Sequence, residues 1–344
     1  LQQLAVNTLG WQSYRGNQLH DWIYRRLATD IQEMTVFSKV NREQLKENYT
    51  VDTGEILKDS LGEDGVRKWL LGFRKGSEVE TVYIPEDSRG TLCVSSQVGC
   101  TLNCRFCNTG NQPVARNLKA GEIVSQVLNA RRMMFDYEAT SGRRLVSNIV
   151  FMGQGEPLFN YREVSKAIGI LSDPEGMAIS KRKIVVSTAG VVPNMARLMK
   201  DFPQVQLAVS LHAVTDKLRT EIMPAANERW PLQEVVDICK THPSLRPTFR
   251  ITFEYVMLKG VNDSLDDAKE LVRLIGGFPS MVNLIPFNPW EGSPFECSSK
   301  NQILRFADFL EREGISAPVR WPRGRDIMAA CGQLRTKHLE EAQL

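Results

Sequence analysis

Segments typical of buried strands alternate with amphipathic helical segments along most of this chain. The strand-like runs are 91–97, 146–152, 183–188, 205–211, 248–257 and 281–286, with a weaker run at 317–320. The helix-like runs are 120–137, 161–171, 192–200, 232–241, 265–275 and 300–313. This alternation predicts βα units around a parallel sheet. Six or seven units are too few for a closed eight-stranded barrel, so we expect an α/β fold, a partial and open (βα)6-type barrel.

A different pattern precedes the barrel. Leu19, Trp22, Ile23 and Leu27 fall on one face of a predicted helix, and a second helical run follows before residue 50. Two strand-like runs, 66–73 and 78–84, then predict a hairpin. We expect four parts: a helical N-terminal accessory domain over 1–60, a hairpin linker over 61–90, the barrel over 91–335 and a tail over 336–344.

Composition limits the classes of protein that the chain can belong to. The 344 residues are 42% hydrophobic and 24% charged, as in ordinary globular enzymes, and the net charge of +3 is only weak support for a polyanionic partner. Seven cysteines, an odd number, indicate a reducing compartment and metal or redox use. The sequence shows no transmembrane-length run and no signal peptide, so we expect a cytoplasmic monomer without membrane contact. Because Leu1 is no initiator residue, we expect that the natural chain begins earlier.

Three cysteines carry the clearest chemical signal. Cys100, Cys104 and Cys107 form the spacing C-x3-C-x2-C. Thiolates grouped in this way bind soft metals and iron–sulfur clusters. Since a cubane [4Fe–4S] cluster normally takes four cysteines, three leave one iron open to a small molecule. The alternative is a structural zinc ion with Cys93 as a remote fourth ligand, in a non-catalytic RNA-binding module.

Polar residues gather where the predicted strands end. In a parallel barrel these ends meet at one mouth, where the chemistry of such folds is found. The residues concerned are Gly155, Glu156, Ser187, Ser210, His212 and Asn288. Each is weak alone, but five strand ends pointing to one mouth predict a cradle for a ligand with an amino-acid end, a ribose and a base.

Several motifs together resemble a known enzyme family. The cysteine spacing, with Phe106 before the last cysteine and a Gly-Glu-Pro turn at 155–157, resembles the radical S-adenosylmethionine (SAM) enzymes. The runs 89–100, 210–212, 224–226, 286–289 and 329–334 are similar to the RlmN family of RNA methyltransferases within that superfamily. The likeness covers nearly the whole chain, and the helical front resembles that family's RNA-binding accessory domain.

The resemblance implies which residues hold the cofactors. In these enzymes the open iron is chelated by SAM, and one electron from the cluster cleaves SAM to a 5′-deoxyadenosyl radical. Cysteines 100, 104 and 107 would hold the cluster, and Gly155 and Glu156 would contact the SAM amino group. The rest of SAM would be lined by Ser187, Ser210, Leu211, His212 and Asn288. Gln154 departs from the family, where methionine is common, but we expect this position to contribute its backbone.

The resemblance also implies the catalytic residues. Cys331 matches the cysteine that becomes S-methylated, Cys93 matches the second catalytic cysteine, and Glu80 matches a proton acceptor. The reaction that the resemblance implies is methylation of adenine at C2. Because this carbon is not nucleophilic, a radical route suits the reaction. Cys331 would take a methyl group from one SAM, a second SAM would supply the radical, and a Cys93–Cys331 disulfide would remain after product release. We interpret Cys239 and Cys297 as structural.

The substrate implied by the resemblance is adenine C2 in 23S ribosomal RNA and in transfer RNA. An external electron donor and a disulfide reductant would be needed. The nearest rival is the related C8-specific methyltransferase of ribosomal RNA. Basic residues form no clear stripe, and the local candidates for RNA contact are Arg25–Arg26, Arg131–Arg132, Arg143–Arg144 and the run 320–325.

Overall fold

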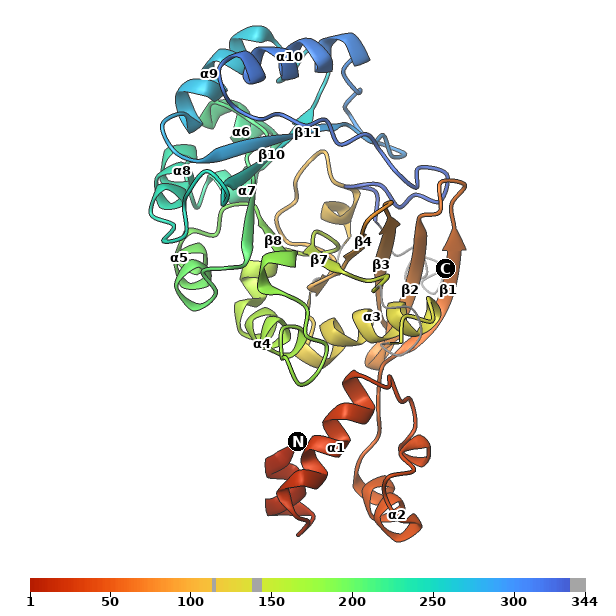
Figure 1. Cartoon of the computed structure of the whole chain (residues 1–344). Coiled ribbons are helices and arrows are strands. Elements are labelled where there is room, and N and C mark those ends of the chain that lie inside the picture. Colours follow the sequence, from red (N-terminus) through yellow and green to blue (C-terminus); the bar gives the residue numbers. More distant parts are fainter. Residues whose placement is uncertain (113–115, 138–143, 335–344) are drawn as a thin grey trace.

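Nine strands form one open sheet in the part of the chain that the structure describes. The structure is a computed structural model, and it describes residues 1–112, 116–137 and 144–334. The strand order is β1-β2-β3-β4-β7-β8-β9-β10-β11 (Figure 1). The six parallel strands are β4 (Gly90–Cys93), β7 (Asn148–Phe151), β8 (Ile184–Thr188), β9 (Gln206–Ser210), β10 (Ile251–Met257) and β11 (Ser280–Pro286). This arrangement confirms the partial (βα)6-type barrel.

Three antiparallel strands extend the sheet beyond β4. They are β1 (Glu55–Leu61), β2 (Arg67–Phe73) and β3 (Ser77–Pro85). The predicted hairpin is present, but it pairs with the barrel strand β4 and is therefore no linker. The prediction of a helical domain reaching residue 60 is wrong at its end, because β1 lies inside it. The strand was missed because most of its side chains are exposed, which removes the alternation that marks a half-buried strand.

Helices cover the outer face of the parallel strands (Figure 1). They are α3 (Ala120–Met133), α4 (Tyr161–Leu171), α5 (Val192–Asp201), α8 (Leu232–Lys240), α9 (Leu265–Ile275) and α10 (Lys300–Arg312), with the unpredicted α6 (Asp216–Ile222) and α7 (Pro224–Asn227) after β9. Short helical turns lie at 74–76, 108–111, 157–160 and 181–183. Helix α3 ends four residues before the predicted boundary, and Phe135 just beyond it has a left-handed backbone with φ of 54°.

Two other predicted strands differ from the observed ones. The run 91–97 stops at Cys93, and Gln97–Val98 (β5) leaves the sheet to pair with Arg116–Asn117 (β6). The weak run 317–320 contributes only isolated parallel bridges to β11, through Ser316 and Val319. The predicted tail over 336–344 lies outside the described residues, as does residue 335.

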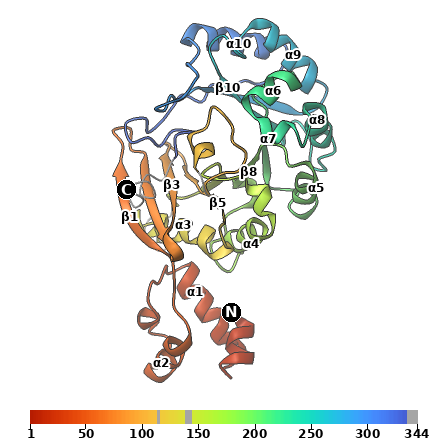
Figure 2. The ribbon, with the colours of Figure 1, turned by 180° about the vertical axis from the view of Figure 1, so that it is seen from behind.

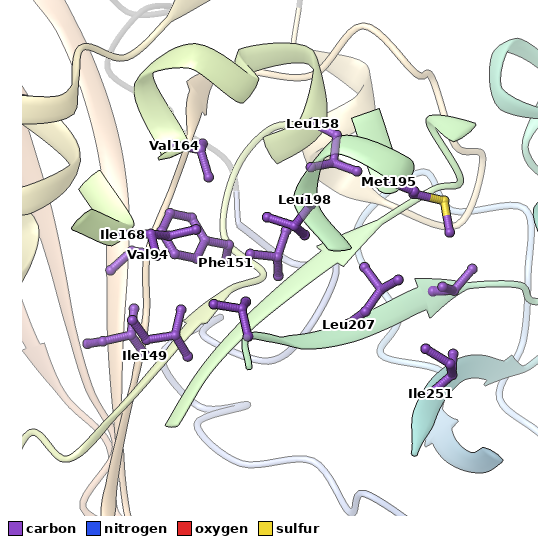
Figure 3. Packing of buried hydrophobic residues seen from close by; sticks show 14 of the residues in the cluster. Val94, Ile149, Phe151, Leu158, Val164, Ile168, Met195, Leu198, Leu207 and Ile251 are labelled. Carbon is purple, nitrogen blue, oxygen red and sulfur yellow. The ribbon is translucent and has the colours of Figure 1, made fainter. Parts of the chain in front are cut away.

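The main core lies between the sheet and its helices. Alternate residues of β7 and β8 point outward, so that Ile149 and Phe151 pack under Val164 and Ile168 of α4 (Figure 3). Residues between them, such as Val150, point to the other side and join a second cluster around Cys93. The side-chain alternation of strands thus separates a helix-covered face from an inner face, which is free to carry polar chemistry.

The N-terminal helices form a small unit with its own core. They are a π-helical turn (Leu4–Thr8), α1 (Ser13–Tyr24), a 3-10 turn (Ile31–Glu33) and α2 (Lys39–Asn48), and they pack around Met34 and Phe37. The unit projects from one end of the barrel, next to α3 (Figures 1 and 2). It is fastened to α3 by Arg131, which donates to the Tyr24 carbonyl at 3.3 Å, and by Arg132, which donates to the Leu27 carbonyl.

These contacts correct one candidate for RNA recognition. Arg131 is buried and Arg132 is half-buried, so both arginines hold the two units together instead of offering charge to a polyanion. Of the other pairs, Arg25 and Arg26 are exposed next to Asp21, and Arg143 lies outside the described residues. Among these pairs, Arg25–Arg26 is the one that the described part of the chain leaves exposed on the helical unit.

A fully buried arginine connects the carboxyl ends of two parallel strands. Arg219 of α6 donates to the carbonyl oxygens of Ala189, Ser210 and Leu211 at 2.6–3.3 Å, and to two acceptors around α7. Burial lowers the pKa of Arg219 to about 10, which still leaves it charged at neutral pH. The carbonyl groups at these strand ends are buried and need hydrogen-bond donors. The single guanidinium of Arg219 supplies them.

Replacing this arginine should weaken the whole barrel. Arg219→Met keeps the side-chain length but leaves the five acceptors without their donor, so we expect the free energy of unfolding to fall by about 3 kcal/mol or more. The matched control is Arg273→Met on the exposed face of α9, which should change stability by less than about 0.5 kcal/mol. Urea unfolding of the two variants measures the difference. Equal small losses in both would contradict the proposed role of Arg219.

Candidate active site

A cavity of about 180 Å³ lies at the carboxyl ends of the parallel strands. Its wall contains residues from the cysteine loop, from the ends of β7 to β11 and from the segment near residue 331. Ten of the predicted site residues line it: Cys100, Cys104, Cys107, Gly155, Glu156, Ser187, Ser210, His212, Asn288 and Cys331. Three other predicted residues, Glu80, Cys93 and Leu211, are not among its lining residues.

The three clustered cysteines share one wall of this cavity. The loop that carries them turns through left-handed backbone at Gly99 and Asn103, and the Cys107 amide donates to the Cys104 carbonyl at 3.0 Å. Burial raises the pKa of Cys100 to about 12, and it raises the pKa of Cys104 further, with the neighbouring thiols adding to the effect. These thiols need a nearby positive charge in order to ionise. A metal cluster supplies that charge and binds the sulfur atoms as thiolates. This loop can therefore hold an iron–sulfur cluster.

Cys93 does not belong to this group. The electrostatic neighbours of its thiol are Cys331 and Arg320, and burial raises its pKa to about 12. Its side chain lies in the inner cluster with Val82 and Val150. A four-cysteine zinc site of Cys93 with the three loop cysteines is therefore not what the structure builds.

The turn after β7 packs so closely that only glycine fits in it. Gly155 has φ of 96°, and a Cβ there would lie 2.5 Å from the Cβ of Gln97. The Gln154 carbonyl accepts hydrogen bonds from the Ser96 and Gln97 amides, as expected for a backbone role. The Gln154 side chain does more than expected, because its oxygen also accepts from the Glu80 amide at 3.3 Å.

Glu156 presents a fixed carboxyl group at this turn. One oxygen accepts from the Leu158 amide at 2.9 Å and the other from the Ala189 amide at 2.7 Å. Burial raises the pKa of Glu156 to about 7 although both hydrogen bonds lower it. A cationic amino group beside it would restore the ionised form, which fits the predicted contact with the SAM ammonium.

His212 is held as a neutral side chain. Its Nδ1 accepts from the Val256 amide at 3.0 Å, and its ring meets the edge of Phe106 with centroids 4.7 Å apart. Burial lowers the pKa of His212 to about 3. The ring therefore offers a flat neutral surface beside the cysteine loop and no proton transfer at neutral pH.

The side chain of Leu211 is not part of the cavity wall. Its side chain is fully buried in the main core, its amide donates to the Glu254 carbonyl, and its carbonyl accepts from Arg219. The structure therefore gives no side-chain contact between Leu211 and the cavity, since the strand alternation turns this residue toward the helices.

The segment around Cys331 is fastened across the cysteine loop. Asn288 donates to the Cys331 carbonyl at 3.1 Å, the Asn108 amide donates to the Gly332 carbonyl at 2.8 Å, and Thr109 donates to the Leu334 carbonyl at 2.7 Å. Cys331 itself is exposed at the cavity, but enough protein surrounds its thiol for desolvation to raise the pKa. The arrangement fixes a thiol above the three loop cysteines.

Glu80 lies in the inner part of the barrel near this segment. Its carboxylate meets the Lys68 ammonium at 2.7 Å, and Lys68 also donates to the Met328 carbonyl at 3.1 Å. Val82, two residues further on the same face of β3, is the register partner of Cys93. The structure thus places Glu80 close to Cys93 in the sheet, although outside the cavity wall.

Two charged residues of the cavity wall were not predicted as cofactor or catalytic residues. Glu254 lies in the middle of the buried strand β10, and Arg320 follows β11 in the chain by way of α10. A lone carboxylate in the apolar run Ile251–Met257 was the signal that could have identified Glu254, because buried charges are rare unless they serve a site.

Ionisation of Glu156 should destabilise the cluster-free protein as the pH rises. The pKa is 4.5 for an unperturbed glutamate and about 7 in the folded chain, so the folded state binds more protons between these values. This contribution to stability is complete below about pH 4.5 and is lost as the pH rises through 7. Relative to Glu156→Gln, wild type should lose up to about 3 kcal/mol of unfolding free energy between about pH 5 and 8. Urea titrations of both proteins at several pH values measure this, and parallel pH profiles would exclude it.

Comparison with known proteins identifies two family regions. Residues 94–275 match the radical SAM superfamily, and residues 1–51 match the ribosomal RNA large subunit methyltransferase N-terminal domain. Both regions agree with the division between the barrel and the helical unit. Membership of the radical SAM superfamily implies a [4Fe–4S] cluster and SAM as cofactors.

Relatives cover almost the whole chain. A dual-specificity RNA methyltransferase RlmN of Rhodopseudomonas palustris (strain BisB5) is 53% identical, with 94% of this chain and 83% of the relative covered. The RlmN of Bradyrhizobium sp. (strain ORS 278) is 53% identical with 95% and 83% covered. The crystal structure of a radical SAM methyltransferase from Sphaerobacter thermophilus is 44% identical, with a TM-score of 0.90 over 96% of this chain and 95% of that one. The chain therefore belongs to the RlmN family of radical SAM RNA methyltransferases.

Proposed function

We propose that this enzyme methylates C2 of adenine in 23S ribosomal RNA and in transfer RNA, with Cys331 as the methyl carrier. The observation that supports the carrier role most strongly is the position of Cys331, on one cavity with the three-cysteine loop and within electrostatic reach of Cys93. A thiol at this place can meet both a SAM methyl group and a base that enters the cavity.

The residues present fit the two cofactors of the family. Cys100, Cys104 and Cys107 would hold the cluster, and Gly155 with Glu156 would receive the amino group of SAM. Ser187, Ser210 and His212 would line the remainder of SAM, with Asn288 fixing the neighbouring Cys331 segment. When bound, the cluster and SAM supply a 5′-deoxyadenosyl radical.

Cys331 would act first as a nucleophile. Its sulfur bonds to the methyl carbon of one SAM while the bond from that carbon to the sulfonium sulfur breaks, and S-adenosylhomocysteine leaves. Arg320 supports this step because its positive charge lowers the pKa of Cys331 against the effect of burial. The methyl group is then held at the cavity as a thioether of the protein.

Cys93 and Glu80 would complete the reaction on the base. A hydrogen atom would pass from the carrier's methyl group to the 5′-deoxyadenosyl radical, and the remaining carbon would bond to C2. One electron, equal to the one that SAM cleavage consumes, would then leave this adduct, and Cys93 would take the C2 proton. Once deprotonated again, the Cys93 sulfur would bond to the Cys331 sulfur while the bond from Cys331 to the transferred carbon breaks, and that carbon would take up a proton to become the methyl group of the released base. Glu80, oriented by Lys68, would accept the proton from this region. An external reductant must reopen the disulfide and an external donor must reduce the cluster, which fits a protein of the reducing cytoplasm.

The RNA would approach over the helical unit and the segment 320–328. The relatives are described as dual-specificity enzymes, and the helical unit matches a domain named for the ribosomal RNA large subunit, which supports two RNA substrates. Trp321 and Met328 are large exposed apolar side chains beside the Cys331 segment, where an unpaired base could stack. Arg323 and Arg325 of the predicted basic run are already bonded to Asp64 and Asn288.

No helix within the described ranges is long and apolar enough to cross a membrane. We propose that the enzyme works as a monomer, because the cavity is complete within one chain. The rival of a non-catalytic zinc-binding module is wrong, since the chain belongs to an enzyme family.

Replacing Cys331 should abolish methyl transfer while leaving the cluster in place. Cys331→Ala removes the carrier sulfur but none of the three loop cysteines, so we expect at least about a 1000-fold loss of methylated RNA with normal iron and sulfide content. The matched control is Cys297→Ala, outside the cavity wall, which should keep near-normal activity. The measurement is anaerobic reconstitution with SAM, a reductant and unmodified RNA, followed by nucleoside mass spectrometry.

The same mass spectrometry separates the proposal from its nearest rival. Product carrying the methyl group on C2 supports the proposal, and product carrying it on C8 would assign the chain to the C8-specific reaction. Retained activity of Cys331→Ala would overturn the carrier role whichever carbon is modified.

A further inference from the structure

The cavity wall holds polar residues besides those predicted to hold the cofactors. Besides Glu156, the charged side chains that line it in the described part of the chain are Glu254 and Arg320. Glu254 is 3% exposed, so its carboxyl group is almost completely removed from water. A group in this state needs hydrogen-bond partners, because an unpaired buried carboxyl oxygen carries a large desolvation cost.

The carboxyl group of Glu254 is satisfied on one side only. Its Oε1 accepts from the Asn283 amide nitrogen at 2.9 Å, across the register pair between β10 and β11. Its Oε2 is buried and makes no hydrogen bond to any described residue. Since Glu254 lines the cavity, a ligand entering there can supply the missing donor.

Arg320 lies next to this carboxyl group. Its Nη1 is 4.0 Å from Glu254 Oε1 and 3.8 Å from the sulfur of Met152. The wall thus presents an acceptor at Glu254 beside a donor at Arg320, and the thiol of Cys331 lines the same cavity.

This adjacent acceptor and donor match one edge of adenine. The exocyclic amino group is a donor, the adjacent N1 is an acceptor, and C2 is the next ring atom. A carboxylate that accepts from the amino group and a guanidinium that donates to N1 would leave C2 beside Cys331. A guanine edge has an oxygen in place of the amino group and a protonated N1, so it would meet like groups on both sides.

We propose that Glu254 and Arg320 read the amino–N1 edge of the target adenine and thereby select this base and orient its C2 toward Cys331. The inference rests on the proposed function, because it assumes an adenine in the cavity. In this proposal both side chains bind the RNA substrate, and neither binds SAM. The neighbouring Ser210, register partner of Glu254, offers a competing explanation in which Glu254 accepts from a SAM hydroxyl, and the test below separates the two.

The test pairs each variant with the base analogue that lacks its contact. A short RNA hairpin carries at the target position adenosine, purine riboside (no amino group) or 1-deazaadenosine (no N1). In wild type we expect kcat/KM to fall about 10- to 100-fold with either analogue. Glu254→Gln should lower kcat/KM for adenosine by a similar factor and reduce the adenosine-to-purine ratio to within about threefold. Arg320→Gln should do the same for the adenosine-to-deazaadenosine ratio.

Two binding measurements and one control complete the design. Hairpin affinity, followed by fluorescence anisotropy without turnover, should show the same pattern of analogue ratios, whereas SAM affinity without RNA should stay within about twofold. Glu313→Gln, an exposed carboxyl at the end of α10, should match wild type throughout. Arg320 is exposed at the rim, so its variant keeps the test valid if Glu254→Gln does not fold.

Each other outcome overturns a definite statement. If Glu254→Gln and Arg320→Gln keep the wild-type discrimination between bases, the reading of the adenine edge is refuted while the proposed function stands. If Glu254→Gln instead weakens SAM binding without RNA, the carboxyl group serves the cofactor and the inference is refuted. If wild type leaves the adenosine hairpin and full-length RNA unmodified, the proposed function fails, and the inference fails with it.

Discussion

Removal of water from ionisable groups is the constraint on which this site depends. The cavity brings together buried carboxyl groups and a buried imidazole with thiols that are partly buried or exposed, and in each case desolvation is the largest influence on the pKa. Groups in this state are neutral or in need of a counter-charge until a ligand arrives. Binding of a metal cluster, a cationic cosubstrate and a base can then supply the missing partners, so the cost of burial in the empty protein becomes selectivity for these ligands.

The barrel tolerates this concentration of polar groups because other polar groups hold its strand ends. Arg219 donates hydrogen bonds to the carbonyl oxygens at the ends of β8 and β9. Glu156 accepts hydrogen bonds from the backbone amides of Leu158 and Ala189, in the turns that follow β7 and β8. On the opposite side, the Cys331 segment is bonded to Asn108, Thr109 and Asn288. The Cys331 thiol therefore lies on a segment that hydrogen bonds fix to the cysteine loop itself.

Sequence and structure agree where a residue's role follows from local pattern. The alternation of strands and helices predicted a partial barrel of six or seven units, and six parallel strands are present. The spacing of Cys100, Cys104 and Cys107 predicted that these thiols lie together on one loop, and all three line the same cavity. They disagree where neighbours distant in the chain decide. The strand Glu55–Leu61 forms because its backbone pairs with the antiparallel strand β2, although its own side chains are mostly exposed. Leu211 belongs to a run that matches the family motif, yet its side chain faces the core.

The sequence by itself determined the fold class, the cysteine loop and the strand ends that would carry polar residues. Hydrophobic periodicity and thiol spacing are properties of short segments, and a short segment is enough to read them. Only the tertiary structure decided which polar groups meet: Cys93 with Cys331 and not with the three loop cysteines, Glu80 with Lys68, and Glu254 with Asn283 and Arg320. These pairs join residues up to 238 positions apart in the chain, the separation of Cys93 and Cys331. Their meeting depends on the register of the sheet and on the closure of the segment 320–334 over the barrel mouth, which no local pattern of residues encodes.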